Sequence, residues 1–200
     1  MIKAGIFSVT LLALTLNNAA QASNTDATIA PYLREDAPVF NLTIAQFREK
    51  FNAANPQMAL TEYKAVKTLE AKSPLIRAVS RINNSLYSSV AIDKSQHTIK
   101  SLQLTYLPPL ISAEKPESAA KTEKANQALL VNYMAAFINQ FEPTLTPEKC
   151  QSQANELLVK GKGLPFYQQT DGTLRLVVSD QHEKGITFAV EPIKLSLAEQ

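Results

Sequence analysis

Two histidines, His97 and His182, are the side chains of this chain that could carry protons near neutral pH. Each lies among turn-forming residues between two strand-forming runs, which predicts hairpin loops at both places. Asp180 and Glu183 stand next to His182, and these three residues together could hold a metal ion. They lack the helical i, i+4 pair or the cysteine pair of a typical site, so we interpret them as a solvated loop and expect no metal.

The only cysteine, Cys150, cannot form an internal disulfide bond. Cys150, Ala154, Leu157 and Leu158 recur with helical spacing, which indicates one apolar helix face. We therefore interpret Cys150 as a small core residue, as free cysteines commonly are. A Cys150–His182 dyad is a conceivable alternative, but no glycine-rich segment flanks the cysteine.

Motifs of the common enzyme classes are missing from the sequence. There is no G-x-S-x-G nucleophile elbow and no dinucleotide-binding fingerprint. The Gly161-Lys162-Gly163 segment resembles a phosphate loop, but it is expected to end a helix, whereas a phosphate loop opens one. We therefore assign no catalytic, cofactor-binding or metal-binding residue and expect no cofactor.

The first 22 residues have the three regions of a secretory signal peptide. Lys3 provides the positive charge, residues 4–16 form a short apolar core, and Ala20-Gln21-Ala22 is a cleavage site. The apolar core is too short to span a bilayer comfortably, and no cysteine follows it for a lipid anchor. We expect cleavage at about Ala22, which leaves residues 23–200 as a single domain, and a bacterial periplasm as the compartment.

The charge balance and hydropathy of the sequence argue against some classes of binding partner. Without Lys3 the chain carries 19 basic and 18 acidic side chains, and tracts of Lys or Arg are missing. This balance argues against nucleic acid as a partner. There is no second long apolar segment, so we expect no stable membrane anchor. Another envelope protein or a small ligand remains as the expected partner.

The firmest structural signal lies near the carboxyl end. Asp171-Gly172 separates two strand-forming runs and predicts a two-residue hairpin turn in which Thr170 pairs with Thr173. A five-residue loop over 180–184 would then return the chain. These registers gather one apolar face, with Leu176 opposite Phe188: Tyr167, Leu174, Leu176, Val178, Ile186, Phe188 and Val190. The other face keeps polar side chains: Gln168, Arg175, Thr187 and Glu191.

Helices must cover this apolar face. Thr43 and Gln46 form a capping box that starts a helix ending at Asn55-Pro56. Ser73-Pro74 predicts the start of a second helix, with serine as cap and proline at the first helical position. Its inward residues would be Leu75, Val79, Ile82 and Leu86. Two further helices follow the midpoint of the chain. The first has an apolar stripe of Leu130, Tyr133, Met134, Phe137, Ile138 and Phe141, and the second begins at Thr146-Pro147.

The remaining segments connect these elements. Residues 23–38 are predicted to form an N-terminal arm, which the side chains of Tyr32 and Leu33 attach to the rest of the fold. Residues 61–68 are predicted to form an edge strand. Residues 86–92 and 98–107 form a further hairpin. Residues 112–124 read as a charged, alanine-rich connector.

The fold class that follows is α+β, with two layers and helices packed on one face of a mainly antiparallel sheet. Residues 39–111 and 116–200 each place helices before an antiparallel hairpin. The apolar positions of the two hairpins match in phase with an offset of 86 residues. This pattern is typical of two related halves that arose by duplication.

Four segments carry a resemblance to known proteins: APYL at 30–33, FREKFN at 47–52, RINNSLY at 81–87 and EKGITFAVEP at 183–192. They resemble the YiiQ-like family, small exported proteins of enterobacteria and relatives that are classed as a domain of unknown function. The resemblance covers nearly all of the chain after the signal peptide. It implies a Gram-negative periplasm and implies no activity.

Three functions fit these observations, and we favour the first. A non-catalytic periplasmic binding or protein-interaction module needs an exposed apolar patch or a concave face. A small envelope hydrolase without a local motif needs a cleft in which His97, His182 or Cys150 meets carboxylates. A carrier of a small apolar ligand needs a cavity between helices and sheet.

Overall fold

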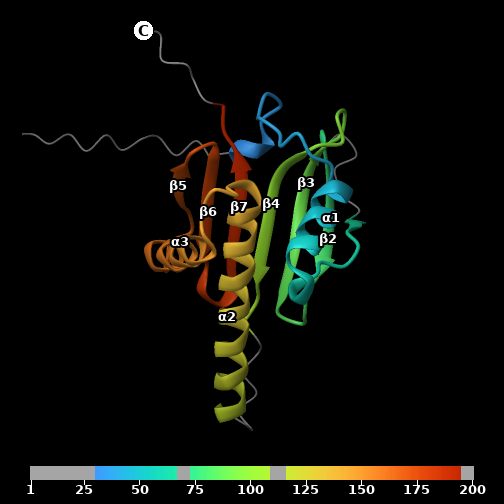
Figure 1. Ribbon diagram of the computed structural model, residues 1–200. Helices are drawn as coiled ribbons and strands as arrows, with labels where there is room; N and C mark the ends of the chain where they lie inside the picture. Colours follow the sequence, from blue (N-terminus) through green and yellow to red (C-terminus); the bar gives the residue numbers. More distant parts are fainter. Residues whose placement is uncertain (1–29, 67–72, 109–115, 195–200) are drawn as a thin grey trace, which may run out of the picture.

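The computed structural model describes residues 30–66, 73–108 and 116–194; the expected signal peptide lies outside these residues. Within them, seven strands form one antiparallel sheet in the order β1-β2-β3-β4-β7-β6-β5. Three α-helices lie together on one face of that sheet (Figure 1). The predicted two-layer α+β architecture is therefore confirmed.

Along the described chain, the short strand β1 and the strands β2 to β4 come before helix α2, and the strands β5 to β7 come after helix α3. The strands are β1 (Lys64–Val66), β2 (Leu75–Arg81), β3 (Leu86–Asp93), β4 (Ile99–Tyr106), β5 (Tyr167–Asp171), β6 (Leu174–Asp180) and β7 (Ile186–Pro192). The helices are α1 (Ile44–Ala54), α2 (Pro116–Phe141) and α3 (Pro147–Lys160). Short 3-10 turns are η1 (Pro31–Leu33), η2 (Pro56–Met58) and η3 (His182–Lys184).

Helix α1 begins and ends where the sequence predicts. The N–H of Gln46 donates to the Thr43 hydroxyl at 3.3 Å, and the N–H of Thr43 donates to the Gln46 side chain at 2.9 Å. This capping box satisfies backbone donors that a helix start leaves open. The helix ends at Asn55, immediately before Pro56. Helix α3 is likewise capped by Thr146, as predicted.

The core lies between the helices and the apolar face of the sheet. Leu176 and Phe188 are both fully buried there, so the prediction that they share a face is confirmed. Helix α2 runs along the central strands of the sheet (Figure 1). Phe137 of α2 makes edge-on ring contacts with Phe47 and Phe51 of α1 at 5.6 and 5.3 Å. Such aromatic contacts add to the burial of each ring, which contributes on the order of 2 kcal/mol by itself.

The register between β6 and β7 is shifted by two residues from the prediction. Leu176 pairs with Val190, so the five-residue loop starts one residue later than expected. The shift brings Arg175 opposite Glu191, and the Arg175 Nη2 lies 2.7 Å from the Glu191 Oε2. Charge-assisted hydrogen bonds of this kind are strong. Because side chains alternate with a period of two, the shift leaves every residue on its predicted face.

The turn between β5 and β6 is also displaced. Asp171 pairs with Leu174, so the two turn residues are Gly172 and Thr173 in place of Asp171-Gly172. Gly172 has a φ of 52°, which a type II′ turn requires at its first central position. The predicted Thr170–Thr173 pair is therefore wrong, and Thr170 faces Arg175.

The predicted second helix, from Ser73-Pro74 onward, is wrong because this segment is strand β2. The Ser73 hydroxyl does accept a hydrogen bond from the N–H of Leu75, as a cap would. The chain then returns through a tight turn, in which the Asn83 side chain accepts from the N–H of Ser85 and of Leu86. This Asx-type turn closes β2 onto β3, and cross-strand pairing outweighs the helical spacing of the leucines.

Helix α2 is longer than predicted, because the expected connector is partly helical. Residues 116–124 belong to α2, while 112–115 lie outside the described residues. Proline at the first helical position and the alanines that follow favour a helix there. The first turns of α2 project beyond the sheet (Figure 1). The apolar stripe around Phe137 faces the core as predicted.

The centre of the sheet is compatible with the predicted duplication. Leu102 pairs with Val190, and Leu104 pairs with Phe188. With the 86-residue offset, Leu102 corresponds to Phe188 and Leu104 to Val190, so the two pairs are equivalent. Val90 pairs with Leu102, whereas their counterparts Leu176 and Phe188 do not pair, because that register differs by two. Duplication of the halves 39–111 and 116–200 stays a prediction.

Replacement of Gly185 by alanine should strongly destabilise the fold. Gly185 has a φ of 96°, and an added Cβ would overlap the carbonyl oxygen of Tyr106 on the neighbouring strand. We expect a loss of more than about 3 kcal/mol in the free energy of unfolding, measured by urea denaturation. Gly172→Ala is the matched control, because there the Cβ meets only the flexible end of Glu142 and the expected cost is about 1 kcal/mol. Equal losses in the two variants would contradict the close approach at Gly185.

Candidate binding groove

The two histidines lie in hairpin loops, as predicted, but at opposite ends of the central strand pair. His97 precedes β4, whereas His182 precedes β7, which runs antiparallel to β4. Both side chains are exposed, and both residues have positive φ angles, 58° and 53°. No cleft among the described residues therefore brings the two imidazoles together.

Asp180 stabilises the loop that carries His182. Its carboxylate accepts hydrogen bonds from the N–H of Gly163 at 2.8 Å and from the N–H of His182 at 3.0 Å. Burial acts to raise the pKa of the Asp180 carboxyl, but the two hydrogen bonds, together with the electrostatic attraction of the His182 and Lys162 side chains, leave the pKa below its ordinary value. The Glu183 side chain lies outside the described residues. In the part of the chain that is described, no three His, Cys, Asp or Glu side chains are grouped to hold a metal ion.

Cys150 is buried on α3, with 1% of its surface exposed, so the prediction that it packs in the core is confirmed. Its neighbours Ala154 and Leu157 are fully buried on the same helix face. The Asn139 amide donates to the Cys150 sulfur over 3.7 Å. Burial raises the pKa of the Cys150 thiol, so the neutral thiol and not the reactive thiolate is present at neutral pH.

A groove of about 510 Å³ opens on the outer side of the helical layer, next to Cys150. One wall is the end of α1 with η2, the floor is one stripe of α2, and the other wall is the start of α3. Its lining residues are Ala54, Asn55, Gln57, Met58, Asn132, Ala135, Ala136, Asn139, Pro147, Cys150 and Gln151. A volume of this size is in the range of small-ligand sites.

The groove is uncharged, and its polar groups are carboxamides. Gln151 of α3 donates to the Asn132 side chain of α2 at 3.3 Å. Asn139 of α2 donates to the carbonyl of Leu145 at 2.9 Å, which fixes the orientation of its amide. Asn55 donates to the carbonyl of Phe51 at the end of α1. These bonds leave the Asn139 Oδ1 and the Asn132 amide nitrogen without a partner among the described residues.

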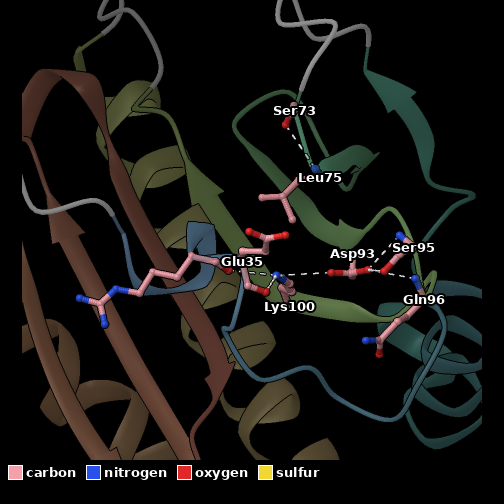
Figure 2. Close-up of polar contacts among 8 residues, drawn as sticks. Glu35, Ser73, Leu75, Asp93, Ser95, Gln96 and Lys100 are labelled. Carbon is pink, nitrogen blue, oxygen red and sulfur yellow. Dashed lines mark hydrogen bonds and ion pairs between the residues drawn. The ribbon is translucent and has the colours of Figure 1, made fainter.

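A second polar cluster surrounds Lys100 on the helix-free face of the sheet (Figure 2). A β-bulge at this point makes Lys100 the extra residue of β4, and its side chain is 2% exposed. Its ammonium group donates to the carbonyls of Arg34 and Glu35 at 3.0 and 3.1 Å and lies 3.4 Å from the Asp93 carboxylate. All three protons of the ammonium group thus have an acceptor.

The Lys100 cluster fastens the N-terminal arm to the sheet. The backbone of Arg34 and Glu35 belongs to that arm, and Tyr32 adds a second contact, because its hydroxyl accepts from the Arg77 guanidinium at 3.3 Å. The predicted docking of the arm through Tyr32 is therefore confirmed. A polar pocket of about 340 Å³ lies beside the cluster, but Lys100 has no donor left for a ligand there.

Sequence reasoning missed both of these places. The groove residues come from three separate helices, and the carbonyls that bind Lys100 lie 65 and 66 positions away from it in the chain. One signal was present: Asn132, Ala135, Ala136 and Asn139 recur with helical spacing beside the core stripe of α2. Such a stripe of small and amide residues marks a helix face that is neither core nor charged surface.

Fold and groove together define a two-layer α+β protein with an uncharged groove on its helical side. In comparisons with known proteins, the family described as "Protein of unknown function (DUF1454)" matches residues 5–199, and the chain belongs to this family. "Uncharacterized protein YiiQ" of Escherichia coli (strain K12) is 44% identical over 195 residues, which cover 97% of this chain and 94% of that protein. The resemblance inferred from the sequence is thereby confirmed. No solved structure matches this chain.

No helix among the described residues is both long enough and apolar enough to cross a lipid bilayer.

Cys150 should be inert in the native protein. Because the thiol is buried and protonated, we expect labelling by Ellman's reagent to be at least about 100-fold slower in the folded state than in urea. The folded protein should also stay free of disulfide-linked dimers under oxidising conditions. Rapid native labelling or rapid dimerisation would show that the thiol is accessible.

Acid should weaken the contacts that the Asp93 carboxylate makes in the Lys100 cluster. Hydrogen bonds from the Ser95 hydroxyl and then the Gln96 N–H lower the pKa of the Asp93 carboxyl from 3.8 to about 2. The stabilisation from the ionised carboxylate is therefore complete above pH 3.8 and is lost as the pH falls through about 2. Urea denaturation between pH 5 and pH 2 should show the stability difference between wild type and Asp93→Asn shrinking, by at most about 1.4 kcal/mol per pH unit. A constant difference over this range would contradict the assignment.

Proposed function

We propose that this protein is a non-catalytic binding module of the periplasm and that its ligand occupies the groove between α1, α2 and α3. The compartment follows from the signal-peptide pattern of the first 22 residues and from the resemblance to an exported family. The observation that carries the binding role is the groove itself, an uncharged concavity lined by carboxamides, in which a 2.9 Å hydrogen bond to the carbonyl of Leu145 holds the Asn139 amide in place.

The groove stands on a rigid base, which a binding site needs. Its floor is the side of α2, and the adjoining faces of α2 are packed into the core through Met134, Phe137 and Ile138, all fully buried. A ligand would therefore meet a largely preformed surface. Binding to a preformed surface requires little ordering of the protein, so more of the interaction energy is available as affinity.

The two other functions have less support. A hydrolase would need His97, His182 or Cys150 to meet carboxylates in a cleft. The histidines lie at opposite ends of the sheet, and among the described residues the side chain that hydrogen-bonds the thiol is the Asn139 amide. A carrier of an apolar ligand would need a cavity between helices and sheet. Fully buried side chains, such as Leu104 of β4, occupy that interior.

The partner that the groove favours is neutral. The groove lining contains no charged side chain, and placing an unpaired charge against it would cost desolvation energy without an opposing charge in return. With its near-neutral net charge, the whole chain also gives no reason to expect nucleic acid.

A matched pair of tryptophan substitutions tests the groove. Ala54 and Ala53 are neighbouring exposed residues of α1, but only Ala54 lines the groove. With a photocrosslinking residue at Gln57, crosslinking in living cells followed by mass spectrometry should capture one recurrent species. Ala54→Trp should reduce that capture by at least about tenfold, because the indole fills the groove, and Ala53→Trp should leave it unchanged. Thermal unfolding of both variants verifies that they fold.

Two outcomes would overturn the proposal. One is capture that is equally strong in both folded variants, because the captured species would then bind elsewhere. The other is the absence of any specific capture from Gln57 in cells that express the protein at its normal level.

A further inference from the structure

We infer that the groove binds an extended, uncharged stretch of polypeptide, about three residues long, through its main-chain amides. This inference rests on the proposed function, since it names the class of ligand for the same groove.

The chemistry of the lining matches a peptide main chain. Five of its eleven residues are Asn or Gln, whose side chains carry the same donor and acceptor groups as a peptide bond. Asn139 uses its amide nitrogen for Leu145 and Cys150, and its Oδ1 has no partner within the described chain. This oxygen is a fixed acceptor for an N–H group of a ligand.

The opposite end of the groove supplies donors. The Asn132 amide nitrogen has no acceptor within the described residues, while its oxygen receives the long 3.3 Å bond from Gln151. A bond of that length is weak, so a ligand could replace it at small cost. Asn132 can therefore donate to a ligand carbonyl, and Gln151 can be released to do the same.

The spacing of these groups sets the length of the ligand. Asn132 and Asn139 are seven residues apart on α2, which places them about 10 Å apart along the helix axis. An extended chain rises about 3.3 Å per residue, so three residues bridge the two amides. A main chain along this path would find a donor at one end of the groove and an acceptor at the other.

The apolar part of the lining fits small side chains. Ala54, Ala135 and Ala136 present only methyl groups, and no aromatic side chain lines the groove to stack on a sugar ring. Met58 on the α1 side is unbranched and can adapt to different ligand side chains. These features favour a peptide with small uncharged side chains over a carbohydrate, which also offers neutral donors and acceptors.

Solution NMR with the folded chain lacking residues 1–22 tests this inference. The probes are Ac-Ala-Ala-Ala-NH2, its charged relative Ac-Ala-Glu-Ala-NH2 and tri-N-acetylglucosamine. We expect saturable shifts of the side-chain NH2 signals of Asn132 and Asn139 with the alanine peptide. The affinity should be at least about fivefold weaker for the glutamate peptide, because the groove offers the carboxylate no partner. The shifts should vanish in Ala54→Trp and persist in Ala53→Trp.

The possible results separate this inference from the function it rests on. Shifts with the sugar and none with the alanine peptide would overturn the polypeptide assignment and leave the groove as a binding site. Equal affinity for the neutral and charged peptides would also overturn it, since recognition would then not depend on the uncharged lining. If neither peptide shifts the two amide signals, the inference fails, while the crosslinking from Gln57 still decides independently whether the groove binds a ligand.

Discussion

The one apolar face of the seven-stranded sheet is the constraint that places every other element. Alternate side chains of β3, β4, β6 and β7 lie on the same face of the sheet and form a broad hydrophobic surface. Exposing this surface to water would be unfavourable, so other elements must cover it. Burying each large side chain contributes on the order of 2 kcal/mol, so the surface as a whole dominates the stability of the fold. Helices α1, α2 and α3 supply the cover, and aromatic residues of α1 and α2 contact one another within the core.

This constraint explains which sequence predictions held and which failed. The face of each C-terminal strand was predicted correctly although both registers were displaced by two residues, because a shift by two preserves the alternation. Among the even shifts of β6 against β7, the observed register is the one that places Arg175 opposite Glu191. Such a contact becomes visible only when the strands are aligned, and the sequence spacing of the two residues does not reveal it.

The error at β2 has a different origin. Leu75, Val79, Ile82 and Leu86 have helical spacing, but the i, i+4 pairs within this set also fit one side of a strand, so the pattern alone favoured the wrong structure. In the structure Ile82 and Leu86 pack with the core cluster, whereas Leu75 and Val79 lie outside it. The deciding signal was the Asn83-Asn84 turn, whose side-chain hydrogen bonds fold β2 back onto β3. Local turn chemistry therefore outweighed periodicity. At α1 and α3 both signals pointed to a helix, and the helices begin where predicted.

The candidate groove exists because helix α2 packs into the core with one face and leaves part of its surface outside. The core uses the stripe around Met134 and Phe137, with Ala135 and Ala136 at its edge, and leaves Asn132 and Asn139 outside the core cluster. Larger apolar residues at the alanine positions would close the gap between α1 and α3 and bury more surface, at about 25 cal/mol per Å². The chain gives up that stabilisation and keeps an open, uncharged groove. Sites that sacrifice stability in this way are usually sites that bind something, which is the physical argument for placing the function of this protein there.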